Sequence, residues 1–503
     1  MADQIDDKER SVVEREVLRV YHNIVLYTNF SYVLTFAFPH PDFQVVDSKV
    51  IDELGLPKDQ GGQFSFLDIA LRADALRQKT EGLVSSDPQT WSPQKKEFLR
   101  LLTNLFGWAK SNSGLPFHII PSIDVGDESW LSPWDATNRE FYDPRVSNEV
   151  ILLSDMAVHY WNGEQLSFDL ASSAFNSSVL SRIEGNEKRS VEHIPLEIFY
   201  NDAKLFFFAK LLYGLAFVLF LVSLFLLKSI WRFVALGTIV LGFCAHTIAL
   251  VVRIIILVRP PVSNLYETFI FVAFISVLLG LIIEWVNKKW IGIVVASVCG
   301  LVFLMIATKF SAEGETMQML VAVLNSNFWL ATHVISITIG YAGCCVAGIV
   351  GHLYIIQNLA KPKDKKLHNS TYQYLVGTLA FGLMMIFLGT MLGGIWADQS
   401  WGRFWGWDPK ENGALLIVIW CAIVFHDKIA RMIGSLGMAA GCVLGIIVVM
   451  WAWFGVNLLN IGLHSYGFTS GVANNLMIYV VCEILFLVIS LSIIRRRGKS
   501  LKK

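Results

Sequence analysis

Nine long apolar runs constrain this chain more than any other feature of its sequence. Each is long enough, or nearly so, to cross about 30 Å of hydrocarbon at about 1.5 Å per residue. The runs lie near residues 205–227, 232–257, 266–286, 290–308, 329–357, 372–396, 413–427, 434–454 and 474–494. The run at 413–427 is short and becomes adequate if its helix begins at Asp408. Because backbone groups inside lipid must hydrogen-bond within the protein, we expect an all-α polytopic membrane protein with about nine transmembrane helices.

The composition supports a membrane protein and narrows the range of partners. Of 503 residues, 54% are hydrophobic and 16% are charged, and the mean hydropathy is +0.52, which places the chain in the membrane class. The formal net charge is zero, so we expect no nucleic acid as a partner. All seven cysteines lie inside apolar runs, and no CxxC or CxxCH motif occurs. We expect these cysteines to pack as small apolar residues, and the chain to attach no c-type haem to itself.

The first part of the chain differs in character from the rest. We expect an extracytoplasmic soluble domain of mixed or uncertain class at 1–203, a first span at 204–231, and the main membrane domain at 232–503. Ser92 followed by Pro93 predicts the start of an amphipathic helix. The apolar stretch 24–38 contains polar residues and is shorter than the ~20 residues of a span. We therefore expect that stretch in a buried core or at an interface.

The connectors between the runs predict the orientation in the membrane. One alternating set, together with the C-terminal tail, carries sixteen lysines and arginines, whereas the opposite set carries four. Positive connectors face the cytoplasm, so we expect a cytoplasmic C-terminus and an extracytoplasmic N-terminal domain, as in a bacterial inner-membrane protein. Residues 1–30 lack the pattern of a signal peptide. We therefore expect preceding spans, from a partner polypeptide or a missing N-terminal half, to start export of the domain. A misplaced start codon with a signal just upstream is the alternative.

A segment rich in tryptophan lies between the sixth and seventh runs, on the predicted outer side. We call residues 397–412 the tryptophan hairpin. Its aromatic residues, set among glycines, suit a flat apolar platform for a planar ligand; they are Trp401, Phe404, Trp405 and Trp407. Asp408, Pro409 and Glu411 have the spacing of a helix start with a capping box. Arg403 is the nearest outer cation, and either water or an acidic group of the ligand, such as a propionate if the ligand is haem, can be its partner.

The histidines near the membrane surfaces raise the possibility of iron ligation. His333 begins the fifth run and His464 follows the eighth, so both are expected on the outer side, with the hairpin between them in sequence. Two neutral imidazoles can fill both axial positions of a haem iron. His426 lies inside the seventh run, and His352, near the inner end of the fifth, is expected to reach lipid headgroups.

His246, in the second run, is a weaker candidate for an intramembrane ligand. Counted from the span ends, it lies about 20 Å above the inner face, and His426 lies about 10 Å above that face. One iron cannot join imidazoles at such different depths, so a polar residue in helix packing is the alternative for His246. The segment "LGTMLGG" (388–394) has small residues four apart, which predicts close helix packing.

These motifs resemble those of a known family. "WGRFWGWDPKE" closely resembles the WWD signature of the haem-handling proteins of cytochrome c maturation. Three further segments resemble the CcsA branch of System II. They are "SNLYE" (263–267), "THVISITIGY" (332–341) and "GVNLLNIGLHSYG" (455–467). The segment "EIFYNDAKLFFFAKLLY" (197–213) is similar to the junction region of fused CcsBA cytochrome c synthases. The resemblance is strong over about 240–500 and loose over 1–230.

The resemblance implies a function and assigns roles to the histidines. A member of this family carries haem b outward and presents it for covalent attachment to the CxxCH cysteines of an apocytochrome c, as part or all of a cytochrome c synthase. His333 and His464 would hold the haem at the outer site, and His426 would belong to an inner site. The implied partners are the apocytochrome, a CcsB-like upstream polypeptide that supplies the second inner imidazole, and a thiol reductant.

Two other classes of function are compatible with the residues alone. A polytopic transporter of a lipid-linked sugar or another flat amphiphile could use the tryptophans as an interfacial clamp. A scaffold could recruit apocytochrome with its outer domain while the chemistry occurs elsewhere. A transporter of that kind would purify colourless, whereas a site with two histidines around haem gives a low-spin spectrum.

Overall fold

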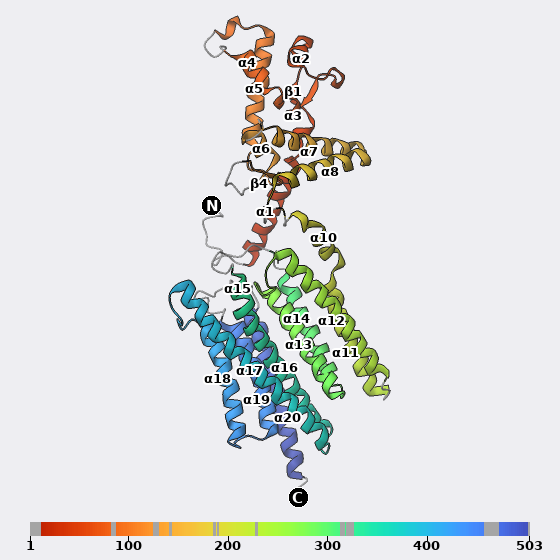
Figure 1. Cartoon of the computed structure of the whole chain (residues 1–503), viewed down its shortest axis with the longest axis vertical. Coiled ribbons are helices and arrows are strands. Elements are labelled where there is room, and N and C mark those ends of the chain that lie inside the picture. The colour runs from red at the N-terminus through yellow and green to blue at the C-terminus, as the bar shows by residue number, and fades with distance from the viewer. Residues whose placement is uncertain are drawn as a thin grey trace. The chain divides into compact units, whose positions relative to one another are not determined.

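The computed structural model divides the chain into two compact units, Met1–Glu192 and His193–Lys503 (Figure 1). It describes residues 12–81, 87–123, 130–139, 143–184, 188, 191–226, 230–311, 317, 326–456 and 472–500. The helix α10 (Ile194–Ala203) packs on the membrane helix α12 (Ile230–Leu257), so it belongs to the second unit. This division lies N-terminal to the boundary expected at residue 203, and the assignment of the first unit to the outside of the membrane stays a prediction.

The first unit is mainly helical. Its helices are α1 (Val12–Tyr32), α2 (Ser48–Leu54), α3 (Phe66–Ala70), α4 (Ala73–Thr80), α5 (Pro93–Ser111), α6 (Pro133–Arg139), α7 (Pro144–Asn162) and α8 (Gln165–Arg182). Two short antiparallel pairs complete the described part, β1 (Pro39–Gln44) with β2 (Gln63–Ser65) and β3 (Ile120–Pro121) with β4 (Trp130–Leu131). The predicted start of α5 is confirmed, since the Ser92 hydroxyl accepts a hydrogen bond from the Lys95 amide.

An aromatic cluster and one ion pair stabilise this unit. Trp134 is fully buried, with the rings of Phe36 and Phe66 at 5.9 and 4.7 Å between centroids. Arg182 donates to the buried carboxylate of Glu149 at 2.6 Å, which joins α8 to α7. Of the two expectations for 24–38, a buried core is wrong for the helical part, because most of the end of α1 is exposed and the buried residues are Val33, Phe36 and Ala37. The alternative, a place at an interface, stays a prediction.

The second unit consists of long helices, as the apolar runs predict. They are α11 (Leu205–Leu226), α12, α13 (Leu265–Asn287), α14 (Ile291–Ser311), α15 (Asn327–Trp329), α16 (Ile335–Ala360), α17 (Lys365–Trp401), α18 (Pro409–Ile429), α19 (Ser435–Trp453) and α20 (Val472–Ser500). Within the described residues, nine helical segments are long and apolar enough to cross a membrane, counting α10–α11 and α15–α16 as one each. The all-α polytopic class is therefore confirmed.

Close helix packing holds the centre of this unit together. Helices α13 and α14 pack along their lengths, as do α16 and α17, and α13 joins the two groups by packing on α16 (Figure 1). A β-carbon at Gly343 of α16 would come within 2.8 Å of the Gly382 Cα of α17, and one at Gly389 would come within 2.7 Å of the Ile337 nitrogen. Glycine at these positions lets two backbones approach, so α16 and α17 form a rigid pair.

Candidate functional site

His333 lies where the fifth span begins, in a π-helical segment, Leu330–Val334, between α15 and α16. Its Nδ1 is 2.7 Å from the carbonyl oxygen of Gly389 on α17. Since a carbonyl oxygen only accepts hydrogen bonds, Nδ1 must carry the proton, and the lone pair of the neutral ring is on Nε2. Histidines that bind metals are oriented by a hydrogen bond of this kind from the other ring nitrogen.

Two adjacent glycines of α17 make room for the imidazole and for the hairpin. A β-carbon at Gly393 would lie 2.6 Å from Cε1 of His333, and a β-carbon at Gly394 would lie 2.6 Å from the ring of Phe404. The same turn of α17 therefore contacts the imidazole on one side and the tryptophan hairpin on the other. The segment 388–394 does pack helices, as predicted, but two of its glycines also shape this site.

Aromatic rings that sequence reasoning did not single out line the histidine. The ring of Trp396 lies 5.7 Å from His333 and stacks on Trp329 at 6.3 Å, with 11° between the planes. Trp329 is held in turn by a hydrogen bond from its indole nitrogen to Gln399. The signal available in the sequence was the i, i+3 spacing of Gly393 and Trp396, which puts both residues on the face of α17 toward His333.

The tryptophan hairpin is ordered by its own polar residues. Helix α17 extends through Trp401 and ends at Gly402, whose φ of 67° is left-handed. Asp408 caps α18 by accepting from the amides of Lys410 and Glu411. The Glu411 carboxylate accepts in return from the amides of Gly406, at 2.7 Å, and Asp408, at 3.2 Å. One carboxylate thus joins the loop to the first turn of α18.

Arg403 is engaged within the hairpin. Its guanidinium lies 3.2 Å from the Glu411 carboxylate and 5.9 Å from the centre of the Trp401 ring. It also occupies the space over Gly406 where a side chain would lie. A guanidinium has five N–H donors, so a partner beyond Glu411 is compatible with this arrangement.

The remaining aromatic side chains of the hairpin differ in exposure. Trp407 is 70% exposed and Phe404 is 42% exposed. Trp405 is half-buried, and its ring stands edge-on to Trp407 at 6.0 Å. Its indole nitrogen is buried without a hydrogen-bond partner among the residues that the structure describes. A large exposed indole beside a half-buried one gives an apolar surface at a span end, where a planar ligand can stack.

Lys410 connects the end of the hairpin, at the start of α18, to the end of α19. Its ammonium donates to the carbonyl of Trp453, at the end of α19, at 2.8 Å. The loop that follows α19 contains His464, which lies in 457–471, outside the described residues. The structure therefore fixes where that loop departs, next to the start of α18.

The other histidines occupy distinct environments. His426, near the end of α18, is exposed, and its Nδ1 contacts the Ala422 carbonyl of the same helix at 2.7 Å. His246 has no exposed surface, lies 3.2 Å from the Tyr213 hydroxyl, and is enclosed by aromatic rings. A haem could reach His246 only if those rings moved.

The expectation for His352 was wrong: its Nε2 lies 2.9 Å from the Glu483 carboxylate of α20, because that acid needs a partner inside the span.

The segment "SNLYE" forms part of a buried polar network. Glu267 and Arg253 are both fully buried and lie 2.8 Å apart. The second carboxylate oxygen of Glu267 accepts from the amide of Ser263, and the Asn264 side chain caps α13. Tyr200 of α10 accepts a further hydrogen bond from Arg253. These contacts join α10, α12 and α13 at one end of the bundle.

Comparison with known proteins identifies the class. Residues 262–464 match the family model described as Cytochrome C assembly protein. The chain is 30% identical over 243 residues to the cytochrome c biogenesis protein CcsA of Prochlorococcus marinus. The alignment covers 41% of this chain and 76% of that protein. It is 34% identical over 220 residues to CcsA of Chlamydomonas reinhardtii, covering 41% of this chain and 61% of that protein. It is 31% identical over 235 residues to Protein NrfI of Wolinella succinogenes, covering 44% of this chain and 25% of that protein.

The helical bundle and the matched region define an integral membrane protein of cytochrome c assembly. More narrowly, the chain belongs to the CcsA family of cytochrome c biogenesis proteins. The matched region contains α13 to α19, and with them His333 and the tryptophan hairpin.

Proposed function

We propose that the chain binds haem b as cargo at an outer site, under the tryptophan hairpin, and presents it for attachment to an apocytochrome c. The observation that carries this proposal is the setting of His333. Its imidazole is oriented by the Gly389 carbonyl, is accommodated by Gly393, and contacts the same turn of α17 as the hairpin. An imidazole with its lone pair on Nε2 is the form that binds haem iron.

The residues present fit a haem better than a compact ligand. Phe404, which packs on the same turn of α17 as His333, and the exposed Trp407 of the same hairpin provide apolar area, and the porphyrin ring would lie against it. We propose His464 as the second axial ligand, since its loop departs from α19 beside Lys410. We propose Arg403 as the partner of a propionate, because its remaining N–H donors allow one more carboxylate.

The orientation follows from the connectors. Lysines and arginines gather on one set of span ends, and we place that set, with the C-terminus, in the cytoplasm. The tryptophan hairpin and the first unit then lie outside, where apocytochromes receive haem. In this arrangement the chain delivers haem to the outer face of the membrane, and the first unit faces the apocytochrome.

We propose His426 as a ligand of haem at an inner site. It is exposed on α18, and the bond from its Nδ1 to the Ala422 carbonyl leaves the lone pair on Nε2. An imidazole on the outside of the bundle is positioned to share iron with an imidazole of another polypeptide. A CcsB-like partner that packs against α18 would supply that second ligand, so the proposal does not require His246.

Attachment itself is an addition without net redox change. Each cysteine S–H of the CxxCH motif adds across a vinyl group of the haem, so that sulfur bonds to one carbon and hydrogen to the other. The cysteines must be reduced beforehand, which is why a thiol reductant of the apocytochrome is an expected partner. The role of this chain's residues is to hold the ring and exclude other ligands from the iron while the thiols approach.

Replacement of the proposed ligands tests the proposal in cells. His333→Gly and His464→Gly should each abolish maturation of a reporter cytochrome c, and added imidazole should restore part of it by filling the vacated position. Gly377→Ala, at a position of α17 where a β-carbon meets nothing within 4 Å, is the control and should mature the reporter. Normal maturation in either histidine variant would show that the ligand assignment is wrong, and a colourless purified wild type would favour a transporter of another amphiphile.

A further inference from the structure

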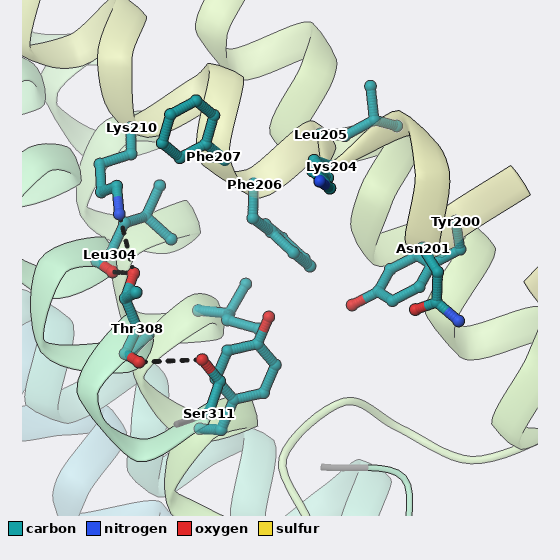
Figure 2. Close-up of a pocket in the computed structure, with 13 residues that line it drawn as sticks. Tyr200, Asn201, Lys204, Leu205, Phe206, Phe207, Lys210, Leu304, Thr308 and Ser311 are labelled. Carbon is teal, nitrogen blue, oxygen red and sulfur yellow. Dashed lines mark hydrogen bonds between the residues drawn. The ribbon is translucent and has the colours of Figure 1, made fainter. Parts of the chain in front are cut away.

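A pocket of about 220 Å³ lies at one end of the bundle (Figure 2). None of its described lining residues belongs to the tryptophan hairpin. It is bounded by the bend between α10 and α11, the start of α13 and the last turns of α14. Lys204, at the bend, has a φ of 46° and separates the two helices. Because α13 begins and α14 ends here, we expect the pocket at a membrane interface rather than in the hydrocarbon.

The charged residues that line this pocket are both lysines. Lys204 and Lys210 line it, and no aspartate or glutamate is among its described lining residues. The Lys210 ammonium donates to the Thr308 hydroxyl at 3.0 Å (Figure 2), and that hydroxyl donates in turn to the Leu304 carbonyl. Since an ammonium has three N–H donors, Lys210 retains donors for an acceptor in the pocket.

The nearby buried charges do not neutralise these lysines. Arg253 and Glu267 lie just beneath the pocket, behind Tyr200 and Tyr266, and pair with each other at 2.8 Å. As an ion pair they contribute little net charge to the space above them. The pocket therefore has a positive potential that an anion would satisfy.

Most of the remaining lining is apolar or aromatic and continues onto the exposed surface of α11. Phe206 lines the pocket near Tyr200 (Figure 2). Its ring centroid lies 6.2 Å from that of Tyr200 and 6.4 Å from that of Tyr266, and Phe207 is 48% exposed at the edge of the pocket. Below it, α11 presents an exposed apolar stripe at helical spacing, formed by Phe208, Leu211, Leu215 and Val218. A ligand that filled this site would have an anionic head among the lysines and an apolar tail along α11.

We propose that this pocket binds the anionic headgroup of a phospholipid, with its acyl chains along α11. A cavity of about 220 Å³ suits a compact phosphate-bearing headgroup. It is smaller than the ~300–1,000 Å³ typical of pockets for drug-sized ligands, so a porphyrin does not fit. The bound lipid would fix the α10–α11 bend against α14, and in the orientation proposed above it would belong to the outer leaflet.

Titration of the full chain in a non-ionic detergent tests this site. The probes are dioctanoyl phosphatidylglycerol, dioctanoyl phosphatidylcholine and inorganic phosphate, measured by calorimetry. We expect the anionic lipid to bind more tightly than the zwitterionic one, and Lys204→Gln and Lys210→Gln each to weaken it about fivefold. Glutamine at 210 can still donate to Thr308, so the fold should persist.

Lys309→Gln is the matched control, because Lys309 is exposed on the last turns of α14 but does not line the pocket. It should leave the affinity for phosphatidylglycerol unchanged. Equal affinities for the two lipids, or equal losses in Lys309→Gln and Lys210→Gln, would overturn the proposal. Inorganic phosphate binding as tightly as phosphatidylglycerol would show that a soluble anion is the ligand and that the lipid assignment is wrong.

Discussion

Substitution of Gly393 by alanine probes the setting of His333 without removing an imidazole. The new β-carbon would lie 2.6 Å from Cε1 and 2.9 Å from Nδ1 of the ring. Carbon atoms in contact are separated by about 3.5 Å, so the imidazole must move by about 1 Å. A movement of that size breaks the 2.7 Å hydrogen bond from Nδ1 to the Gly389 carbonyl.

The expected loss follows from the role of that hydrogen bond. Loss of the hydrogen bond that orients a metal-bound histidine lowers the affinity for the metal by about 10–100-fold. This corresponds to about 1.4–2.8 kcal/mol. We therefore expect Gly393→Ala to retain about 10–100-fold less haem on dilution or on competition with an apo-globin. The measurement is haem per folded chain in purified protein, together with the yield of a reporter cytochrome c.

Gly377→Ala is the matched control on the same helix. Nothing lies within 4 Å of a β-carbon at Gly377, so alanine there changes only the helix propensity, by about 1 kcal/mol in favour of the helix. If Gly393→Ala binds haem as tightly as Gly377→Ala, His333 is not held in a constrained position and the reasoning fails.

Three further predictions concern the hairpin, its connection to α19, and the first unit. Asp408→Asn preserves a good helix cap, so this variant should mature cytochrome almost normally. Trp405→Ala and Trp407→Ala should lose haem while the amount of the protein in the membrane stays normal. An equal loss of the protein from the membrane in all three variants would show that the tryptophans are purely structural. Lys410→Met removes the hydrogen bond to the Trp453 carbonyl, so haem retention should fall several-fold while the chain accumulates normally; unchanged retention would contradict this role. Arg182→Met leaves the Glu149 carboxylate buried and should destabilise the first unit by about 3–5 kcal/mol, measured by proteolysis of the full chain in urea, with partial recovery in the double variant with Glu149→Gln.

Features that depend on neighbours in sequence could be predicted. The nine spans follow from the length of each apolar run, and the start of α5 at Ser92 and Pro93 follows from local capping chemistry. The structure also begins α18 at Pro409, which gives the short seventh run enough length. Each of these depends on the chemistry of a few adjacent residues, which a single sequence contains in full.

Contacts between distant segments could not be predicted in the same way. The Gly389 carbonyl is 56 residues from His333, and a backbone acceptor leaves no mark in the sequence. The partner of His352, Glu483, is 131 residues away, so counting depth along one helix placed that histidine at the headgroups. Helix packing decided both cases, and periodicity alone does not specify which helices are neighbours.

Low-temperature electron paramagnetic resonance of the purified, oxidised protein tests the central claim most directly. A haem held by His333 and His464 should give a low-spin ferric signal typical of two imidazole ligands. His333→Gly should convert that signal to high spin, and added imidazole should restore it. A wild-type protein without haem, or a low-spin signal that His333→Gly leaves unchanged, would contradict the account.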